Sequence, residues 1–257
     1  MIRKLSIILS LFLFITVFPA CGTDRTDTPA AATSDEEISS AILRESEDMG
    51  KNYIDSFVFF GESTTYHLKN REVLSGGKNT TQVLGNKSGT AMLDERTSDM
   101  YVILPESGAL VTVSEALRRK KPKYLMLCFG LNGATSKVKR GKEYFKGCYL
   151  SLINTVRTAS PETKIIISSC FPVAENMDMS NYSVTLDGLN GCIDTLNSWA
   201  IELCEENNLK YLNVNEILTD SHGRLKLEFQ VGDGHHLTRE AYIKILEYIR
   251  THGYKYE

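Results

Sequence analysis

The 257-residue chain lacks the cysteine and histidine spacings of zinc sites and the basic clusters of nucleic-acid-binding proteins. None of its six cysteines forms a Cys-x-x-Cys pair, and no cysteine and histidine group has zinc-site spacing. The sequence therefore predicts no metal and no cofactor. The formal net charge is −3, and the only dense basic run, residues 118–121, is typical of a solvated helix end rather than a nucleic-acid surface. The domain contains no internal repeat and no low-complexity segment.

The longest apolar run, residues 5–18, follows a short positive segment and is too short to span a bilayer comfortably. Its length is that of a signal-peptide core. Ala20 and Cys21 come directly after it and resemble the lipobox of bacterial lipoproteins, although Phe18 stands where such motifs usually carry Leu. The resemblance implies that residues 1–20 are a signal peptide and that a lipid on Cys21 anchors the mature protein outside the cytoplasm, on the bacterial cell membrane. An ordinary signal peptide and an uncleaved anchor are the alternatives.

Residues 22–34 contain no large apolar side chain and predict a flexible tether. Ser34 to Glu37 have the form of a capping box, which predicts a helix to about Met49. Residues 21–50 are thus expected to hold the lipidated cysteine, the tether and a leading helix, and residues 51–257 a single domain. Within it, Cys128 and Cys170 lie in apolar runs and are expected to be buried. In an exported protein, one disulfide among the five remaining cysteines is an open possibility.

Continuous apolar runs alternate with helical segments along the domain. Strands are predicted at residues 57–60, 124–129, 164–168 and 210–214, each typical of a strand buried on both faces of a parallel sheet. Helices are predicted at residues 112–120, 141–159, 189–207 and 239–252. The alternation predicts an α/β fold, a mostly parallel sheet with helices on both faces. Residues 76–111 fit it poorly and predict an irregular β-rich insertion, with short strands at 80–84, 90–93 and 100–104.

Polar side chains follow these strands at the edge where parallel sheets bind ligands. Ser63 follows the first strand, Asn132 the second, and Asp233 and His236 precede the last helix. Each has an ordinary structural explanation alone: Ser63 as a helix cap, Asn132 in an Asn-Gly turn, Asp233 in a turn and His236 in an exposed loop. Their convergence on one edge favours a catalytic site.

The same residues resemble the motif blocks of the SGNH (GDSL-like) hydrolases. Gly-Glu-Ser at 61–63 matches the first block except that Glu62 replaces the usual Asp, Gly-Leu-Asn at 130–132 matches the third, and Asp-Gly-His-His at 233–236 matches the last. The similarity spans about residues 55–253. The glycine of the second block is Gly89, with Gly85 as the alternative. The resemblance implies the three-layer, flavodoxin-like fold of that family and an esterase activity.

The resemblance also implies roles for these residues. Ser63 is the expected nucleophile, His236 its base and Asp233 the group that orients the base, with His235 as the rival base. The oxyanion is expected to meet the N–H groups of Ser63 and Gly89 and the amide of Asn132. His67, just after the nucleophile, and Tyr182, in the loop after the third strand, are expected to contact substrate. His222 is expected in a surface turn.

The substrate is expected to be a small-molecule or glycan ester, because an exported, anchored enzyme meets cell-wall or environmental polymers. The absence of a long apolar lid segment disfavours a lipase. Removal of short acyl groups, chiefly acetyl, from a carbohydrate is the favoured hypothesis. Acyl transfer between sugars uses the same residues and stays open. The alternative from another class is a surface glycan-binding lipoprotein without turnover.

Overall fold

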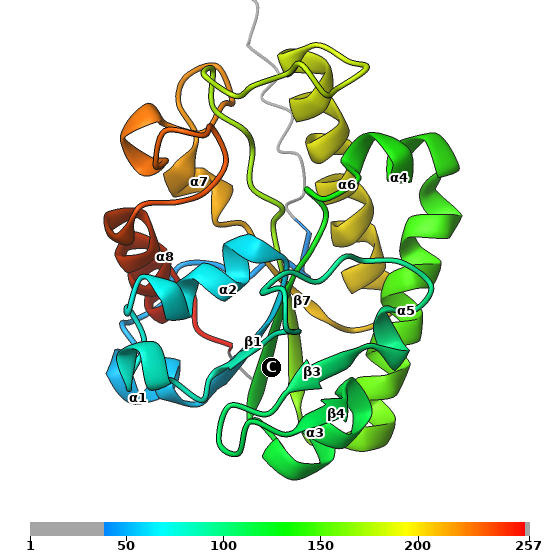
Figure 1. Ribbon diagram of the computed structural model, residues 1–257, viewed down its shortest axis with the longest axis vertical. Helices are drawn as coiled ribbons and strands as arrows, with labels where there is room; N and C mark the ends of the chain where they lie inside the picture. The colour runs from blue at the N-terminus through cyan, green and yellow to red at the C-terminus, as the bar shows by residue number, and fades with distance from the viewer. Residues whose placement is uncertain (1–38, 255–257) are drawn as a thin grey trace, which may run out of the picture. The chain divides into compact units, whose positions relative to one another are not determined.

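The computed structural model describes residues 39–254 (Figure 1). The predicted signal peptide, the lipidated Cys21 and the tether lie outside these residues. In the described part, no helix is long and apolar enough to cross a membrane. The five cysteines within this range are all free, so the disulfide that the sequence left open is not formed here.

The described chain forms a parallel β-sheet whose strand order is β2-β1-β5-β6-β7. Every neighbouring pair in the sheet is parallel. This is the flavodoxin-like order of doubly wound sheets, and it confirms the predicted fold class. The strands are β1 (Phe57–Gly61), β2 (Val83–Leu84), β5 (Tyr124–Cys128), β6 (Lys164–Ser168) and β7 (Lys210–Leu212). The four predicted strands all form, with ends shifted by at most two residues.

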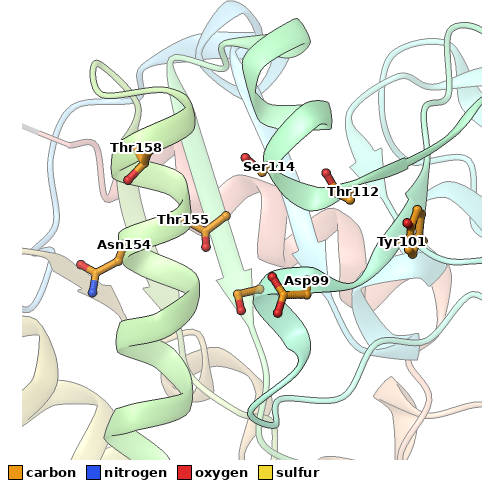
Figure 2. Close-up of a pocket in the computed structure, with 8 residues that line it drawn as sticks. Asp99, Tyr101, Thr112, Ser114, Asn154, Thr155 and Thr158 are labelled. Carbon is orange, nitrogen blue, oxygen red and sulfur yellow. The ribbon is translucent and has the colours of Figure 1, made fainter.

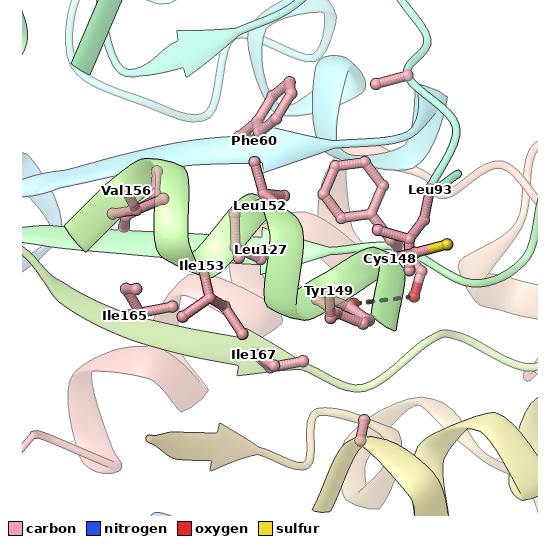
Figure 3. Close-up of a cluster of buried hydrophobic side chains, with 14 of the residues drawn as sticks. Phe60, Leu93, Leu127, Cys148, Tyr149, Leu152, Ile153, Val156, Ile165 and Ile167 are labelled. Atoms are coloured by element: carbon pink, nitrogen blue, oxygen red, sulfur yellow. Dashed lines mark hydrogen bonds between the residues drawn. The ribbon is translucent and has the colours of Figure 1, made fainter. Parts of the chain in front are cut away.

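Side chains that alternate along each strand enter two separate apolar cores. Val58 and Phe60 of β1 belong to one core, whereas Phe57 and Phe59 belong to the other. Because successive side chains point to opposite faces of a strand, both faces of this sheet must be covered. Figure 3 shows the first core, where Leu152, Ile153 and Val156 of one long helix lie over the sheet.

Helices cover both faces and give the molecule three layers (Figure 1). Side chains of α3, α4, α5 and α6 enter the first core, and those of α1, α2, α7 and α8 enter the second. The four predicted helices are present with small shifts at their ends. The helices are α1 (Gly50–Asp55), α2 (Ser63–Asn70), α3 (Val113–Lys120), α4 (Ala134–Arg140), α5 (Lys142–Ala159), α6 (Leu186–Glu206), α7 (Asn215–Leu218) and α8 (Arg239–Thr251).

The insertion before α3 is irregular, as predicted, but two of its expected strands differ. Of the strand predicted at 80–84, only residues 83–84 pair with a neighbouring strand, and residues 90–93 form no strand. Instead β3 (Tyr101–Ile103) pairs antiparallel with β4 (Leu110–Thr112). Two short 3₁₀ turns also form: η1 (Gly77–Asn79) precedes β2, and η2 (Thr97–Asp99) lies at the end of the loop between β2 and β3. The apolar side chains of 90–93 are used for packing instead, since Ala91 and Leu93 are buried in the first core.

The predicted leading helix is wrong over its described part, residues 39–49. Residues 41–43 lie beside β7 instead, where Leu43 N–H donates to the Tyr211 carbonyl at 2.8 Å and Tyr211 N–H donates to the Ala41 carbonyl at 2.8 Å. The edge of the sheet offers unpaired backbone groups, and these bonds outweigh the local helix preference. The domain therefore begins before residue 51, because Ala41 and Leu43 are already buried in it.

Candidate active site

Three segments far apart in the sequence meet at the carboxyl ends of the strands. Ser63 is the first residue of α2, directly after β1, and Asn132 lies in the loop between β5 and α4. Asp233 and His236 lie in the loop before α8. Gly61 lets the first segment approach the second, because a Cβ there would lie 2.2 Å from the Cys128 carbonyl oxygen. The expected site residues thus gather on one edge.

Ser63, His236 and Asp233 form a continuous chain of hydrogen bonds. Ser63 Oγ lies 3.0 Å from His236 Nε2, and His236 Nδ1 lies 2.7 Å from Asp233 Oδ2. Glu62, not Ser63, is the N-cap residue of α2. Ser63 is therefore free of the helix-capping role that was its alternative explanation. This is the geometry in which a histidine accepts the proton of a serine while a carboxylate fixes its ring.

The turn at Gly234 places the two neighbouring histidines side by side. Asp233 Oδ1 accepts hydrogen bonds from the N–H groups of His235 at 3.1 Å and His236 at 2.9 Å, and Gly234 has φ +83°. The chain is therefore folded here rather than extended. The rival base, His235, lies beside His236: their ring centroids are 4.0 Å apart, and both residues line the same pocket. Among the described residues, only His236 hydrogen-bonds Ser63 Oγ.

The protonation of the site follows from its hydrogen bonds and burial. Partial burial disfavours the Asp233 carboxylate, but the hydrogen bonds from His236 and from the N–H of His235 outweigh it and hold the pKa of Asp233 at about 2. Burial, followed by the charges of His236 and Arg71, lowers the pKa of His67 to about 4. Asp233 is thus ionised and His67 neutral near pH 7. The ring centroids of His67 and His236 lie 4.6 Å apart.

Asn132 is held by hydrogen bonds to both its side chain and its backbone. Its side-chain Nδ2 donates to Thr90 Oγ1 at 3.2 Å, and its backbone N–H donates to Glu62 Oε2 at 2.9 Å. The other carboxylate oxygen of Glu62 accepts from Gly130 N–H at 3.0 Å. Burial raises the pKa of Glu62, whereas these N–H groups and the charge of Lys137 lower it. The residue that departs from the family motif therefore holds the loop that carries Asn132.

Gly89 lies in the pocket, but its N–H is already used. It donates to the Asn86 carbonyl at 3.1 Å, closing a turn over residues 86–89 in which Gly89 has φ +69°. The expected contact of this N–H with the oxyanion therefore has no support here. Gly85, the alternative, is not among the described residues that line the pocket. Ser63 N–H and the Asn132 amide remain as the expected donors.

The pocket around Ser63 has a volume of about 580 Å³. His67 and the residues 88–92 of the insertion line it, and so does Tyr66, which the sequence did not single out. Tyr66 packs against Gly85 and Gly89, where an added Cβ would come within 2.9 Å of its ring. Tyr182 is not among the described lining residues, so its expected contact with substrate has no support here.

A second groove, of about 600 Å³, lies between α5 and the segment from η2 to α3 (Figure 2). Its lining is polar and holds one carboxylate, Asp99, together with hydroxyl, phenol and amide groups. None of its described lining residues is a histidine or a cysteine. Because a hydroxyl nucleophile needs an adjacent base, this groove offers no catalytic pair, and the pocket around Ser63 is the candidate active site.

Asp233, His235 and His236 also form a group whose possible ligand atoms lie within 4.8 Å of one another. His236 Nδ1 is bonded to Asp233 and its Nε2 to Ser63. A metal held by this group would have to displace one of those hydrogen bonds. The arrangement as it stands suits proton transfer.

The model of the GDSL-like Lipase/Acylhydrolase family matches residues 59–243. The chain belongs to this family. The matched range begins within β1 and ends within α8, so it contains Ser63, Asn132, Asp233 and His236. Membership supports an ester hydrolase at the general level. No curated protein matches the chain.

Several solved structures are similar to this chain. One, from Desulfitobacterium hafniense, is described as a lipolytic protein of the G-D-S-L family; it is 14% identical, the match covers 75% of this chain and 95% of that one, and the TM-score is 0.50. Another, described as an acylhydrolase from Bacteroides fragilis, is 16% identical, with 80% and 86% covered and a TM-score of 0.50. A family 3 carbohydrate esterase from Clostridium thermocellum is 15% identical, with 75% and 91% covered and a TM-score of 0.40.

Proposed function

We propose that this GDSL-like protein is a serine esterase that removes short acyl groups, chiefly acetyl, from a glycan. The observation that carries the proposal is the chain of hydrogen bonds from Ser63 Oγ to His236 at 3.0 Å and on to Asp233 at 2.7 Å. Family membership supports ester hydrolysis in general, and the chain of bonds supports the roles of the individual residues.

The reaction follows from this geometry in two steps. Ser63 Oγ attacks the ester carbonyl carbon while its proton passes to His236 Nε2, and the Asp233 carboxylate stabilises the imidazolium. The leaving alcohol takes that proton, which leaves an acyl group on Ser63. Water then loses a proton to His236 and attacks the carbonyl carbon of the acyl group. The bond from this carbon to Ser63 Oγ breaks, His236 returns the proton to Ser63 Oγ, and the carboxylic acid is released. Acyl transfer differs only in that a sugar hydroxyl replaces the water.

Two donors are proposed to stabilise the oxyanion. Ser63 opens α2, where the first backbone N–H groups have no partner within the helix. The Asn132 amide, bonded to Thr90 through Nδ2, has a second hydrogen to offer. Loss of one such donor typically costs about 3 kcal/mol in the transition state. Asn132→Ala should therefore lower kcat by about a hundredfold.

The nature of the pocket supports a short acyl group and a polar alcohol. His67, Ser88, Thr90 and Asn132 contribute polar groups to its lining, and Tyr66, Ala91 and Met92 contribute apolar surface. A long acyl chain needs an extended apolar surface, which these residues do not provide. The proposed anchor at Cys21 supports a polymer as substrate, because an enzyme held outside the cell meets cell-wall or environmental glycans.

The test compares esters and variants under one assay. The wild type should hydrolyse an aryl acetate faster than an aryl octanoate and should release acetate from an acetylated polysaccharide. Ser63→Ala should abolish all three activities, whereas Ser114→Ala, in the second groove, should leave them unchanged. Activity should also survive EDTA, because the proposed chemistry uses no metal.

Full activity in the Ser63→Ala variant would overturn the proposal, as would loss in EDTA that zinc restores. If no ester were turned over while the protein bound the polysaccharide, the non-catalytic glycan-binding alternative would replace it.

A further inference from the structure

A buried lysine lies beside the proposed oxyanion donor, and the mechanism above does not use it. Lys137, in α4, is only 4% exposed. Its Nζ donates a hydrogen bond to the backbone carbonyl of Asn132. Taking an ammonium group out of water costs free energy, so a buried lysine is stable only where hydrogen bonds and nearby charges offset this cost.

Helix geometry explains how Lys137 reaches back to this loop. Side chains of a helix tilt toward its N-terminus, so a residue in the first turn can reach the segment before the helix. Gly133, between the two residues, has φ +75°, and an added Cβ there would lie 3.4 Å from Lys137 Nζ. The turn at Gly133 thus gives the ammonium group room beside the Asn132 carbonyl.

Glu62 holds the same backbone from the opposite side. Its carboxylate accepts hydrogen bonds from the N–H groups of Gly130 at 3.0 Å and Asn132 at 2.9 Å. Burial lowers the pKa of Lys137 and raises that of Glu62, but each charge favours the charged form of the other. Asn132 is therefore bonded at its N–H by the buried carboxyl group of Glu62 and at its C=O by the buried Nζ of Lys137.

We propose that Lys137 is a positioning residue for the esterase reaction, which together with Glu62 fixes the backbone of Asn132 so that its amide points where the oxyanion forms. A donor stabilises a transition state fully only when it is held in place before the reaction. The proposal rests on the proposed function in one respect, namely that Asn132 is an oxyanion donor. It adds a lysine that acts on catalysis through another residue.

The first test measures kcat per active site for an aryl acetate, with active sites counted by fluorophosphonate titration. Lys137→Met keeps an unbranched side chain, shorter by the terminal nitrogen, and so removes the donor and the charge. The value of kcat should fall about 10- to 100-fold with KM changed less than about threefold. Lys139→Met, an exposed position on the same helix, is the matched control and should leave kcat unchanged.

A double-mutant cycle separates positioning from general stability. If Lys137 acts through the Asn132 amide, Lys137→Met should cost almost nothing further in kcat once Asn132→Ala has removed that amide. Costs that multiply independently would overturn the proposal, and so would a Lys137→Met variant that keeps wild-type kcat per active site.

A third measurement does not depend on activity. Amide hydrogen exchange at residues 130–133 should be faster in Lys137→Met than in Lys139→Met, because one of the three hydrogen bonds from Glu62 and Lys137 to this loop is lost. Unchanged exchange would overturn the proposal even if the protein hydrolysed no ester. If the wild type had no esterase activity but exchange were faster in Lys137→Met, the proposed function would be refuted. The role of Lys137 in fixing the Asn132 backbone would still be established.

Discussion

Asp233 bonds the backbone of two adjacent histidines, but it bonds the ring of only one through its carboxylate. Both N–H groups donate to Oδ1, while Oδ2 accepts from the His236 ring at 2.7 Å. The His235 ring instead lies 3.2 Å from the Asp233 carbonyl oxygen through Nδ1. The side chain of Asp233 therefore selects which of two similar imidazoles is oriented toward the serine.

Substitution of the two histidines should have very different effects. His236→Ala removes the base, so kcat should fall by about four to six orders of magnitude, with the residual rate due to binding and the oxyanion donors. His235→Ala removes a ring that only lines the pocket and lies tilted against the ring of the base, and should cost about tenfold or less. Steady-state kinetics of both variants would check this. A large loss of kcat in His235→Ala together with a small loss in His236→Ala would show that His235, not His236, is the base.

His67 should make the stability of the protein depend on pH. Its pKa is lowered from 6.5 to about 4 in the folded protein, so the unfolded chain binds the extra proton first as the pH falls. Stability from this residue is therefore fully present above pH 6.5 and is lost as the pH falls from there toward 4. Thermal unfolding should show that the Tm of the wild type drops relative to that of His67→Gln across this window.

The same substitution should leave the shape of the pH–activity profile unchanged above about pH 5, because His67 is already neutral there. Parallel Tm curves for the two proteins between pH 6.5 and 4 would contradict the assigned shift.

At the scale of single residues, the sequence allowed the prediction of Ser63, Asn132, Asp233 and His236 because each follows a strand or precedes the last helix. The role of Glu62 in holding the loop was not foreseen, although its position beside the nucleophile was a signal. Lys137 gave no signal, because a lysine in a short polar helix is normally solvated.

At the scale of elements, the loop before α8 is locked against the segment that follows β6. Ala174 N–H donates to the Gly234 carbonyl at 2.8 Å, and a Cβ on Gly234 would lie 2.5 Å from Met177 Cα. The close packing of the Gly234 backbone against residues 174–177 fixes the positions of Asp233 and His236. Only glycine satisfies both the contact and the φ of +83°.

Gly234→Ala should therefore damage both stability and catalysis. The strained φ and the clash with Met177 should together lower the free energy of unfolding by about 2 kcal/mol or more, and kcat should fall as the triad is displaced. Gly232→Ala is the matched control, because Gly232 has φ +111° but nothing within 4 Å of an added Cβ. Equal losses in the two variants, measured by chemical denaturation and kinetics, would show that the contact with Met177 is unimportant.

Strands buried on both faces could be predicted from the sequence. Segments whose conformation depends on hydrogen bonds to a part of the chain distant in the sequence could not. The runs that became β1, β5 and β6 are apolar enough to be recognised alone. Residues 39–49 were misassigned because their conformation depends on the free edge of β7, which is distant in the sequence. The turn over residues 86–89 that occupies the Gly89 N–H likewise depends on local hydrogen bonds that a motif does not reveal.

At the scale of the whole molecule, the sequence predicts an esterase domain held at a membrane by a lipid on Cys21. The prediction rests on the Ala20-Cys21 junction after the apolar run and lies outside the described residues. In a bacterial host, the mature protein should partition into the detergent phase, and Cys21→Ser should block processing or release it. Mass spectrometry of the mature N-terminus checks the lipid directly, and an unmodified N-terminus would refute the anchor.

The central claim is that Ser63 is a nucleophile activated by His236, and covalent labelling tests it most directly. A fluorophosphonate should modify the folded protein at one site, and peptide mapping by mass spectrometry should place the label on Ser63. The label should be absent from Ser63→Ala and strongly reduced in His236→Ala. Stoichiometric labelling of a different residue, or labelling of Ser63 that is unaffected by loss of His236, would contradict the account.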